Sequence, residues 1–156
     1  MTRVFLAPVD RESYLATLES EIDLSGWEGR PSDFPAQARV WGVRTDPEMG
    51  DWKRNRSSLD KMSEGDPILF YYNEEYFAQG RVGVMCETEY IRDHYWDGGP
   101  AINVYTIESY SEDIELEREK LSELLEYSKN FHPQGLWIVN EDRPVEDLLN
   151  HIGVDF

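Results

Sequence analysis

The 156-residue chain has little cysteine, little lysine and no long apolar segment. Its one cysteine, Cys86, cannot form an internal disulfide, and its apolar neighbours Val84 and Met85 predict a small buried thiol. The first eight residues contain no hydrophobic run that approaches the length of a signal peptide or a membrane span. We therefore expect a cytoplasmic protein that folds without disulfides.

Motifs that carry catalysis are also scarce. The three histidines, His94, His132 and His151, lie far apart, and none pairs with a second histidine or a cysteine at the spacing of metal ligands. The sequence has no Gly-x-Ser-x-Gly, Gly-x-x-x-x-Gly-Lys or His-x-Glu pattern, so the common hydrolase, P-loop and deaminase signatures are excluded. We expect a binding module rather than an enzyme, with no metal ion and no cofactor.

Lysine is rare because the chain is strongly acidic and its few cations are mostly arginine. There are 32 Asp and Glu against 15 Lys and Arg, only four of them Lys, and the net charge is -17. Hydrophobic residues at 40% and aromatics at 13% exclude a disordered chain. Acidic, lysine-poor surfaces suit a cytoplasm at high salt, where charges are screened within about 3 Å at 1 M. We interpret the chain as halophilic and haloarchaeal; an ordinary acidic interaction domain is the alternative.

The length fits one domain over residues 1–156, and hydrophobic periodicity divides it into strands and helices. Gly80 and Gly83 inside one long strand predict a bulge or bend that curls a sheet toward a barrel. We expect strands over 4–6, 38–44, 67–72, 77–88, 102–110 and 136–139, helices over 14–22, 55–62, 111–125 and 144–152, and a loop over 23–38. The predicted fold class is α+β: a small, mixed, strongly curved β-barrel of about six strands with peripheral helices.

One segment departs from the acidic composition of the rest of the chain. From Arg39 to Lys61 there are six basic and four acidic residues, a balance of +2, which leaves -19 for the rest of the chain. Cations kept together on an otherwise acidic surface favour an anionic partner such as phosphate, unless acidic residues neutralise them in the fold. The candidate phosphate-binding residues are Arg44, Lys53, Arg54, Arg56 and Lys61.

Aromatic and polar residues beside these cations suggest a pocket for a planar ring. Trp52 and Trp96 fall in loops, whereas Trp41 and Trp137 fall in predicted strands, and two loop tryptophans can sandwich a base for about 1–3 kcal/mol per stacked base. The carboxylate of Asp46 can accept from the amino group of cytosine or adenine, with Thr45 and Asn55 as further candidates. The alternatives are turn chemistry at Asp46 and helix capping by Asn55.

The order of these segments resembles the PUA-like superfamily, and within it the EVE and YTH domains, which bind modified nucleotides. The resemblance spans residues 38–110 and rests on Val40 to Asp46, on Trp52 with Asn55 and Leu59, on Met62, Gly65, Asp66 and 68–72, on Phe77, Gly80, Val82 and Gly83, and on Trp96. It implies that Asp46 and Thr45 read the base edge, that Trp52 is one wall of an aromatic cage, and that Trp96 or Tyr95 is the second wall.

Two departures from the family pattern bear on the ligand. The family's lysine-serine pair is Arg44-Thr45 here, and Asp46 replaces a frequent asparagine. An acceptor-only carboxylate favours a base with an amino group, so we expect C5-modified cytosine, such as 5-methyl- or 5-hydroxymethylcytosine, rather than methylated adenine.

The resemblance implies a reader of modified DNA that flips the base into its cage. Such domains resemble specificity modules of modification-dependent restriction systems, so a fused or partner nuclease is expected, with the chain either a solitary reader or a fragment of a larger protein. Two alternatives are a PUA-like protein that binds structured or modified RNA, and an acidic protein-interaction module that uses residues 115–126.

Overall fold

The fold is built around one curved sheet with short helices at its ends and rim. A computed structural model describes residues 3–45, 52–97, 101–140 and 142–153, with the backbone alone at Trp52. The strands are β1 (Phe5–Pro8), β2 (Ile22–Asp23), β3 (Gln37–Val43), β4 (Pro67–Tyr72), β5 (Glu75–Glu87), β6 (Asn103–Ser111) and β7 (Trp137–Ile138). The helices are α1 (Arg11–Ser13), which continues as a π-helical turn η1 (Tyr14–Leu18), then α2 (Trp52–Lys61), α3 (Tyr90–Tyr95), α4 (Arg118–Leu125) and α5 (Val145–Ile152).

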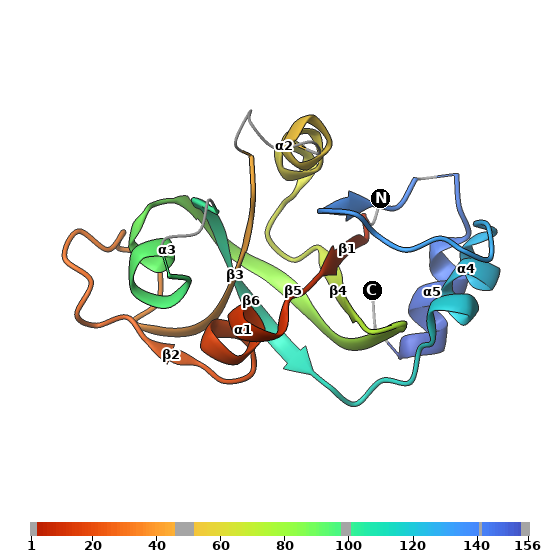
Figure 1. Cartoon of the computed structure of the whole chain (residues 1–156), viewed down its shortest axis with the longest axis horizontal. Helices are drawn as coiled ribbons and strands as arrows, with labels where there is room; N and C mark the ends of the chain where they lie inside the picture. Colours follow the sequence, from red (N-terminus) through yellow and green to blue (C-terminus); the bar gives the residue numbers. More distant parts are fainter. Residues whose placement is uncertain (1–2, 46–51, 98–100, 141, 154–156) are drawn as a thin grey trace.

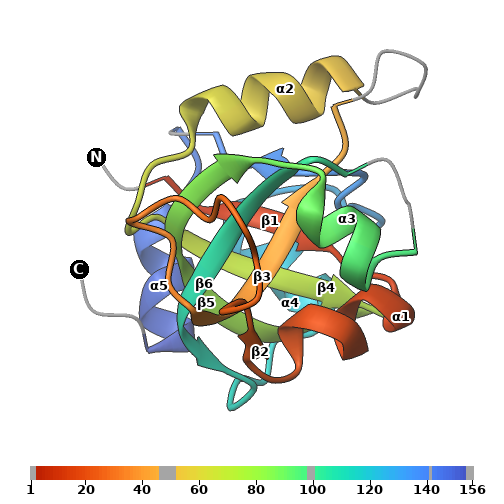
Figure 2. The same cartoon turned by 90° about the vertical axis from the view of Figure 1, so that its left-hand side faces the viewer.

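The strands follow the order β2-β3-β6-β5-β4-β1-β7 in a sheet that curls but does not close. Strands β1 and β4 run parallel, and the other neighbouring pairs are antiparallel. Helix α2 lies above the sheet, α1 and α3 lie at one end of the molecule, and α4 and α5 lie at the other (Figure 1, Figure 2). The predicted α+β class and curved mixed sheet are confirmed, with two of the seven strands only two residues long.

The long hairpin β4–β5 supplies much of the curvature. Its two-residue turn, Asn73 and Glu74, has positive φ values of 52° and 70°, as the right-handed strand twist favours. The register between β5 and β6 shifts twice, between Gln79 and Arg81, where Gly80 lies, and between Val82 and Met85, where Gly83 lies. A Cβ at Gly83 would collide with Thr106 Oγ1, which accepts a hydrogen bond from Val84 N at 2.9 Å. The predicted bulges are therefore present, and one of them needs glycine for space.

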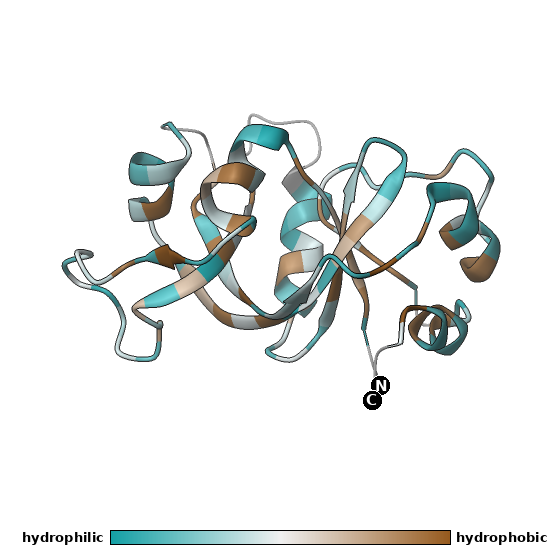
Figure 3. Ribbon diagram, turned by 90° about the horizontal axis from the view of Figure 1, so that it is seen from below, coloured by the Kyte–Doolittle hydropathy of each residue, from teal (hydrophilic) through white to brown (hydrophobic). Residues whose placement is uncertain are grey.

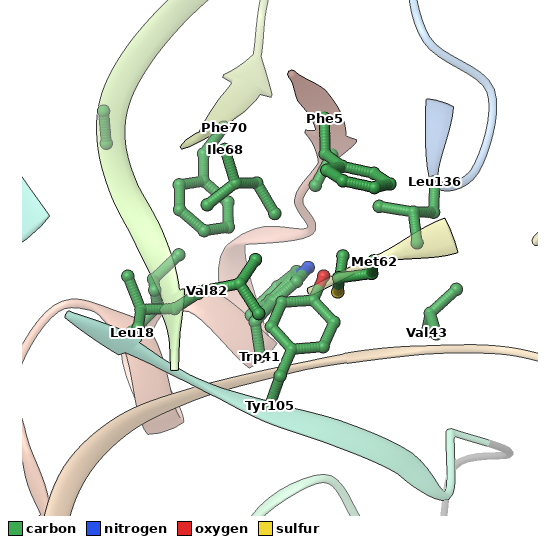
Figure 4. Packing of buried hydrophobic residues seen from close by; sticks show 13 residues of the cluster. Phe5, Leu18, Trp41, Val43, Met62, Ile68, Phe70, Val82, Tyr105 and Leu136 are labelled. Carbon is green, nitrogen blue, oxygen red and sulfur yellow. The ribbon is translucent and has the colours of Figure 1, made fainter. Parts of the chain in front are cut away.

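Buried apolar residues form three clusters. The central cluster fills the curl of the sheet and contains Phe5, Trp41, Phe70 and Tyr105 (Figure 4). A second cluster lies between the sheet and helices α4 and α5, and a third lies beneath α3 and the 24–36 loop, where Trp27 and Phe34 meet edge to face. Hydrophobic and hydrophilic residues alternate along α4 and α5 (Figure 3), and the buried residues of these helices are mostly leucines, because only one face of each is covered.

Four local predictions are wrong in detail. Strand β6 continues to Ser111, whose Oγ accepts from Asp113 N, so this serine does not begin a helix; α4 begins at Arg118. The first helix ends at Leu18 because Ile22 pairs with Ala38 in the sheet. Helix α2 begins at Trp52, a residue predicted to lie in a loop, and α3 forms where no element was predicted. Cys86 is only partly buried at the edge of the third cluster, where burial raises the pKa of its thiol.

Candidate functional site

A pocket lies at the open side of the curled sheet, where β1 and β3 face each other without pairing. Three strands separate them in the sheet order. The outer strands β2 and β7 pair only with residues 37–38 of β3 and 5–6 of β1, so the remaining residues of β1 and β3 border the gap. The pocket has a volume of about 360 Å³, within the range of about 300–1,000 Å³ usual for small-ligand sites. Its lining comes from Ala7, Pro8, Asp10, Ser13, Trp41, Gly42, Val43, Arg44, Asn55, Trp96, Ala101, Tyr105, Gly135 and Leu136.

Two tryptophans form an aromatic corner in this pocket. Trp41 projects from β3 into the central cluster and is only 6% exposed, and Trp96 follows the last residue of α3. Their ring centroids lie 6.2 Å apart and their planes meet at 71°, so the rings form perpendicular walls rather than parallel plates. Trp41 also meets Phe70 edge to face at 6.1 Å, which fixes it from behind. A flat ring that enters can stack on one wall and meet the other at its edge.

The floor of the pocket is apolar apart from one hydroxyl. Tyr105 is fully buried beside Trp41, Val43 and Leu136 (Figure 4), and burial raises the pKa of its phenol. Its hydroxyl has no hydrogen-bond partner among the described residues. An unpaired buried hydroxyl costs about 1–3 kcal/mol, so the unpaired Tyr105 hydroxyl lowers the free energy of unfolding.

The rim carries opposite charges. Asp10 follows β1 and caps α1, where one carboxylate oxygen, Oδ2, accepts from Ser13 N at 2.9 Å. A carboxylate offers about four lone-pair sites, so this bond leaves Asp10 able to accept from a ligand. Arg44, an exposed and positively charged residue directly after β3, lines the same pocket. The rim can therefore bind an amino group at one point and an anion at another.

Asn55 lines the pocket, but its side chain is engaged in holding the walls together. It is 2% exposed; its Nδ2 donates to Arg44 O at 2.7 Å, and its Oδ1 accepts from Leu136 N at 2.9 Å. Ser58, one turn later, donates to Leu136 O at 3.0 Å. Both backbone groups of Leu136 are thus bonded by side chains of α2, which joins the helix to the segment directly before β7.

The other face of α2 carries the cations predicted to bind phosphate. Lys53, Arg54, Arg56 and Lys61 are all exposed. Arg56 forms an ion pair with Asp60 at 3.3 Å, and Arg54 donates to Gln134 O at 3.2 Å with its guanidinium over the Trp137 ring at 5.2 Å. The predicted cationic segment therefore lies along one side of the pocket, although Arg54 is also used to dock the helix.

Two of the predicted base-binding residues lie away from the pocket. Thr45 Oγ1 accepts from Asn103 Nδ2 at 2.7 Å, and Thr45 does not line the pocket. Tyr95 donates its hydroxyl to Asp23 O at 3.1 Å and packs against the third cluster, so it does not line the pocket with Trp96. Asp46 and the side chain of Trp52 lie outside the described residues. Of the predicted set, the structure brings together Arg44, Asn55 and Trp96.

Sequence reasoning missed Asp10 and Trp41. The strand position of Trp41 suggested core packing, and it is indeed core, but at the open end of the core. Asp10 directly follows Pro8 and Val9 at the end of β1, and a polar residue after a buried strand was the available signal. The sequence did not show that β1, as well as β3, borders the open side of the sheet.

Two common features are not found in the part of the chain that the structure describes. No group of three His, Cys, Asp or Glu side chains there could hold a metal ion. No helix among residues 3–45, 52–97, 101–140 and 142–153 is long and apolar enough to cross a membrane.

Comparison with solved structures finds this architecture elsewhere. No protein-family model matches the chain, and a search of curated proteins finds no match. The N-terminal domain of Thermococcus gammatolerans McrB bound to m5C DNA superposes with a TM-score of 0.68 at 12% identity, over 96% of each chain. A point mutant of the ZmASCH protein from Zymomonas mobilis gives a TM-score of 0.53 at 10% identity, over 94% of this chain and 96% of the other. The chain has the fold of these domains, an α+β fold built on one curved mixed sheet, as its sequence predicted.

Proposed function

We propose that the chain is a reader domain that binds a modified base in DNA, C5-modified cytosine above all, after the base flips out of the duplex into the pocket. The observation that carries this proposal is the aromatic corner of Trp41 and Trp96 at the open side of the sheet, with Asp10 and Arg44 on its rim. Its support from the comparison is that a domain of the same fold was solved bound to m5C DNA.

The pocket chemistry suits a cytosine. Stacking of the base on an aromatic wall contributes about 1–3 kcal/mol, which can offset the few kcal/mol that unstacking from the duplex costs. Asp10 is the proposed acceptor for the exocyclic amino group, the role that the sequence suggested for Asp46. Apolar side chains on β3 and before β7, Val43 and Leu136, can contact a C5 methyl or hydroxymethyl group.

The phosphate chain is proposed to lie along α2. Arg44 at the rim and the exposed Lys53, Arg56 and Lys61 present positive charge beside the pocket, on a chain of net charge -17. Each phosphate that such a cation neutralises releases counterions and makes affinity depend on salt. Trp52, three positions before Asn55, remains the proposed additional wall of the cage.

The wider role we propose is that of the specificity module of a modification-dependent restriction system. In this role the chain binds modified DNA in the cytoplasm of a halophile, and a fused or partner nuclease cuts it. The domain itself is proposed to have no catalytic activity, and any cleavage is assigned to the nuclease.

The proposal is tested by binding to duplexes that differ at one base. Fluorescence anisotropy in high KCl is measured with cytosine, 5-methylcytosine, 5-hydroxymethylcytosine or methylated adenine at the central position, and with an RNA of the same sequence. We expect at least about tenfold tighter binding to a modified cytosine, the value of one good additional contact. Equal affinity for all duplexes, or a preference for RNA, would overturn the proposal.

Variants assign the contacts. Trp96→Leu keeps an apolar side chain and should abolish discrimination. Trp137→Phe, in β7 and outside the pocket lining, is the matched control and should not change it. Asp10→Asn preserves helix capping, because Asn and Asp cap equally well. The amide oxygen can keep the cap, but the second carboxylate oxygen is replaced by an NH2 group, which donates and does not accept. If Asp10 reads the amino group, this variant loses affinity for modified DNA with no loss of stability.

Arg56→Gln tests the phosphate contacts. It should weaken binding to all duplexes equally and lower the slope of the salt dependence of affinity by about 1.

A further inference from the structure

Trp96 is held in place by groups from two distant parts of the chain. Its indole Nε1 donates to Thr17 Oγ1 at 3.3 Å, and Thr17 Oγ1 donates to Val40 O at 2.6 Å. Thr17 is completely buried, so this hydroxyl has little access to water. The chain of hydrogen bonds ties the indole to the backbone of β3 through a side chain of η1.

The opposite edge of the indole lies on Gly42. A Cβ at this position would lie 2.8 Å from both Cη2 and Cζ3 of Trp96, and 3.2 Å from Asn103 O. Real Cβ contacts are longer than this, so any side chain at Gly42 would push the ring away. The φ angle of Gly42 is not in the left-handed region, so the backbone does not require glycine here. The close approach of the ring does.

The π-helical turn η1 supplies Thr17. Glu19 N donates to Tyr14 O at 2.9 Å, five residues back, which makes this turn wider than an α-helical one. Such turns are rare and occur often at functional sites. Here two consecutive side chains, Thr17 and Leu18, are buried, with Leu18 in the central cluster and Thr17 beneath Trp96. The turn thus connects α1, whose N-cap Asp10 lines the pocket, to Thr17, the residue that holds the Trp96 indole.

We propose that Thr17 and Gly42 are positioning residues that fix the Trp96 indole as a pocket wall before the ligand arrives. This proposal rests on the proposed function, since it assigns how the base-binding wall is built. A wall held in advance loses no side-chain freedom on binding, so more of the stacking energy remains for affinity and discrimination. Thr17 does not line the pocket, and Gly42 lines it with backbone atoms alone.

The indole N–H resonance of Trp96 tests the positioning without any ligand. The resonance is assigned by its absence in Trp96→Phe and then followed in Thr17→Val, Thr17→Ser and Gly42→Ala. We expect Thr17→Val and Gly42→Ala to shift it and Thr17→Ser, which keeps the hydroxyl, to restore the wild-type position. Gly42→Ala changes no hydrogen-bonding group, so it tests the same wall if Thr17→Val does not fold.

Binding to the 5-methylcytosine and cytosine duplexes gives the second readout. We expect Thr17→Val to lose about fivefold in the affinity ratio of the two duplexes, the worth of one net hydrogen bond, and Thr17→Ser to retain it. An unmoved resonance and an unchanged ratio in both Thr17→Val and Gly42→Ala would overturn the positioning assignment. A wild-type protein that does not discriminate would instead overturn the proposed function, whatever the resonance does.

Discussion

Replacement of Asn55 by alanine distinguishes a structural role for this residue from the base contact suggested by the sequence. The substitution removes two hydrogen bonds, from Leu136 N at 2.9 Å and to Arg44 O at 2.7 Å. Leu136 is 3% exposed, so its N–H would stay unpaired at about 1–3 kcal/mol, whereas water can reach the exposed Arg44. Alanine regains at most about 0.7 kcal/mol of helix propensity. The expected loss in free energy of unfolding is about 2 kcal/mol, the upper end of the Leu136 cost less this gain.

Urea unfolding followed by circular dichroism measures this loss, with Ser57→Ala as the matched control. Ser57 lies on the exposed face of the same helix, so its replacement should change the free energy of unfolding by less than about 0.5 kcal/mol. For Asn55→Ala the midpoint should fall by about 1 M urea at an m-value of about 2 kcal/mol/M. A variant of wild-type stability that no longer distinguishes modified from unmodified DNA would refute this reasoning, because Asn55 would then be a base contact.

Three further predictions concern stability. Tyr105→Phe removes a buried hydroxyl without a partner among the described residues and should raise the free energy of unfolding by about 1 kcal/mol in a urea titration; a loss of that size would show that the hydroxyl is bonded. Burial and a hydrogen bond to Glu112 raise the pKa of Tyr14 to about 12. Because the folded pKa exceeds the unfolded value of about 10, this stability is complete below about pH 10 and is lost as the pH rises through about 12. Glu112→Gln should lose less stability than wild type between about pH 9 and pH 11, with the exposed Glu115→Gln as control, and equal losses would contradict the assignment. Finally, a net charge of -17 predicts that the melting temperature rises from about 0.2 M to about 2 M KCl as self-repulsion is screened; a flat or falling curve would contradict the halophilic interpretation.

Local sequence signals predicted the parts of the fold that depend on neighbours along the chain. Strand β4 was predicted at its observed bounds, and the glycines of β5 marked the bulges, because turn and bulge chemistry acts over a few residues. The helix predicted at Ser111 failed because the end of β6 pairs with Gln79, a partner 32 positions away. Periodicity cannot reveal such pairing.

The site was only half predictable for the same reason. The cations of α2 and Trp96 stood out from the sequence because they depart from the acidic composition and from periodic apolar patterns. Asp10 did not, because its place on the pocket rim depends on β1 pairing with β4, 60 or more positions away, at the edge of an open sheet. Asn55 lies at the pocket, but its bonds to Arg44 and Leu136 could be seen only once those segments were in position.

The central claim, that a modified cytosine leaves the duplex and enters the pocket, is tested most directly by 2-aminopurine fluorescence. The fluorescent base is placed beside the central cytosine, where its emission rises when its neighbour unstacks. We predict that saturating wild-type protein raises the emission of the 5-methylcytosine duplex but not of the unmodified one, and that Trp96→Leu removes the rise. Saturated binding to the modified duplex with no change in emission would contradict base flipping and with it the account of this pocket.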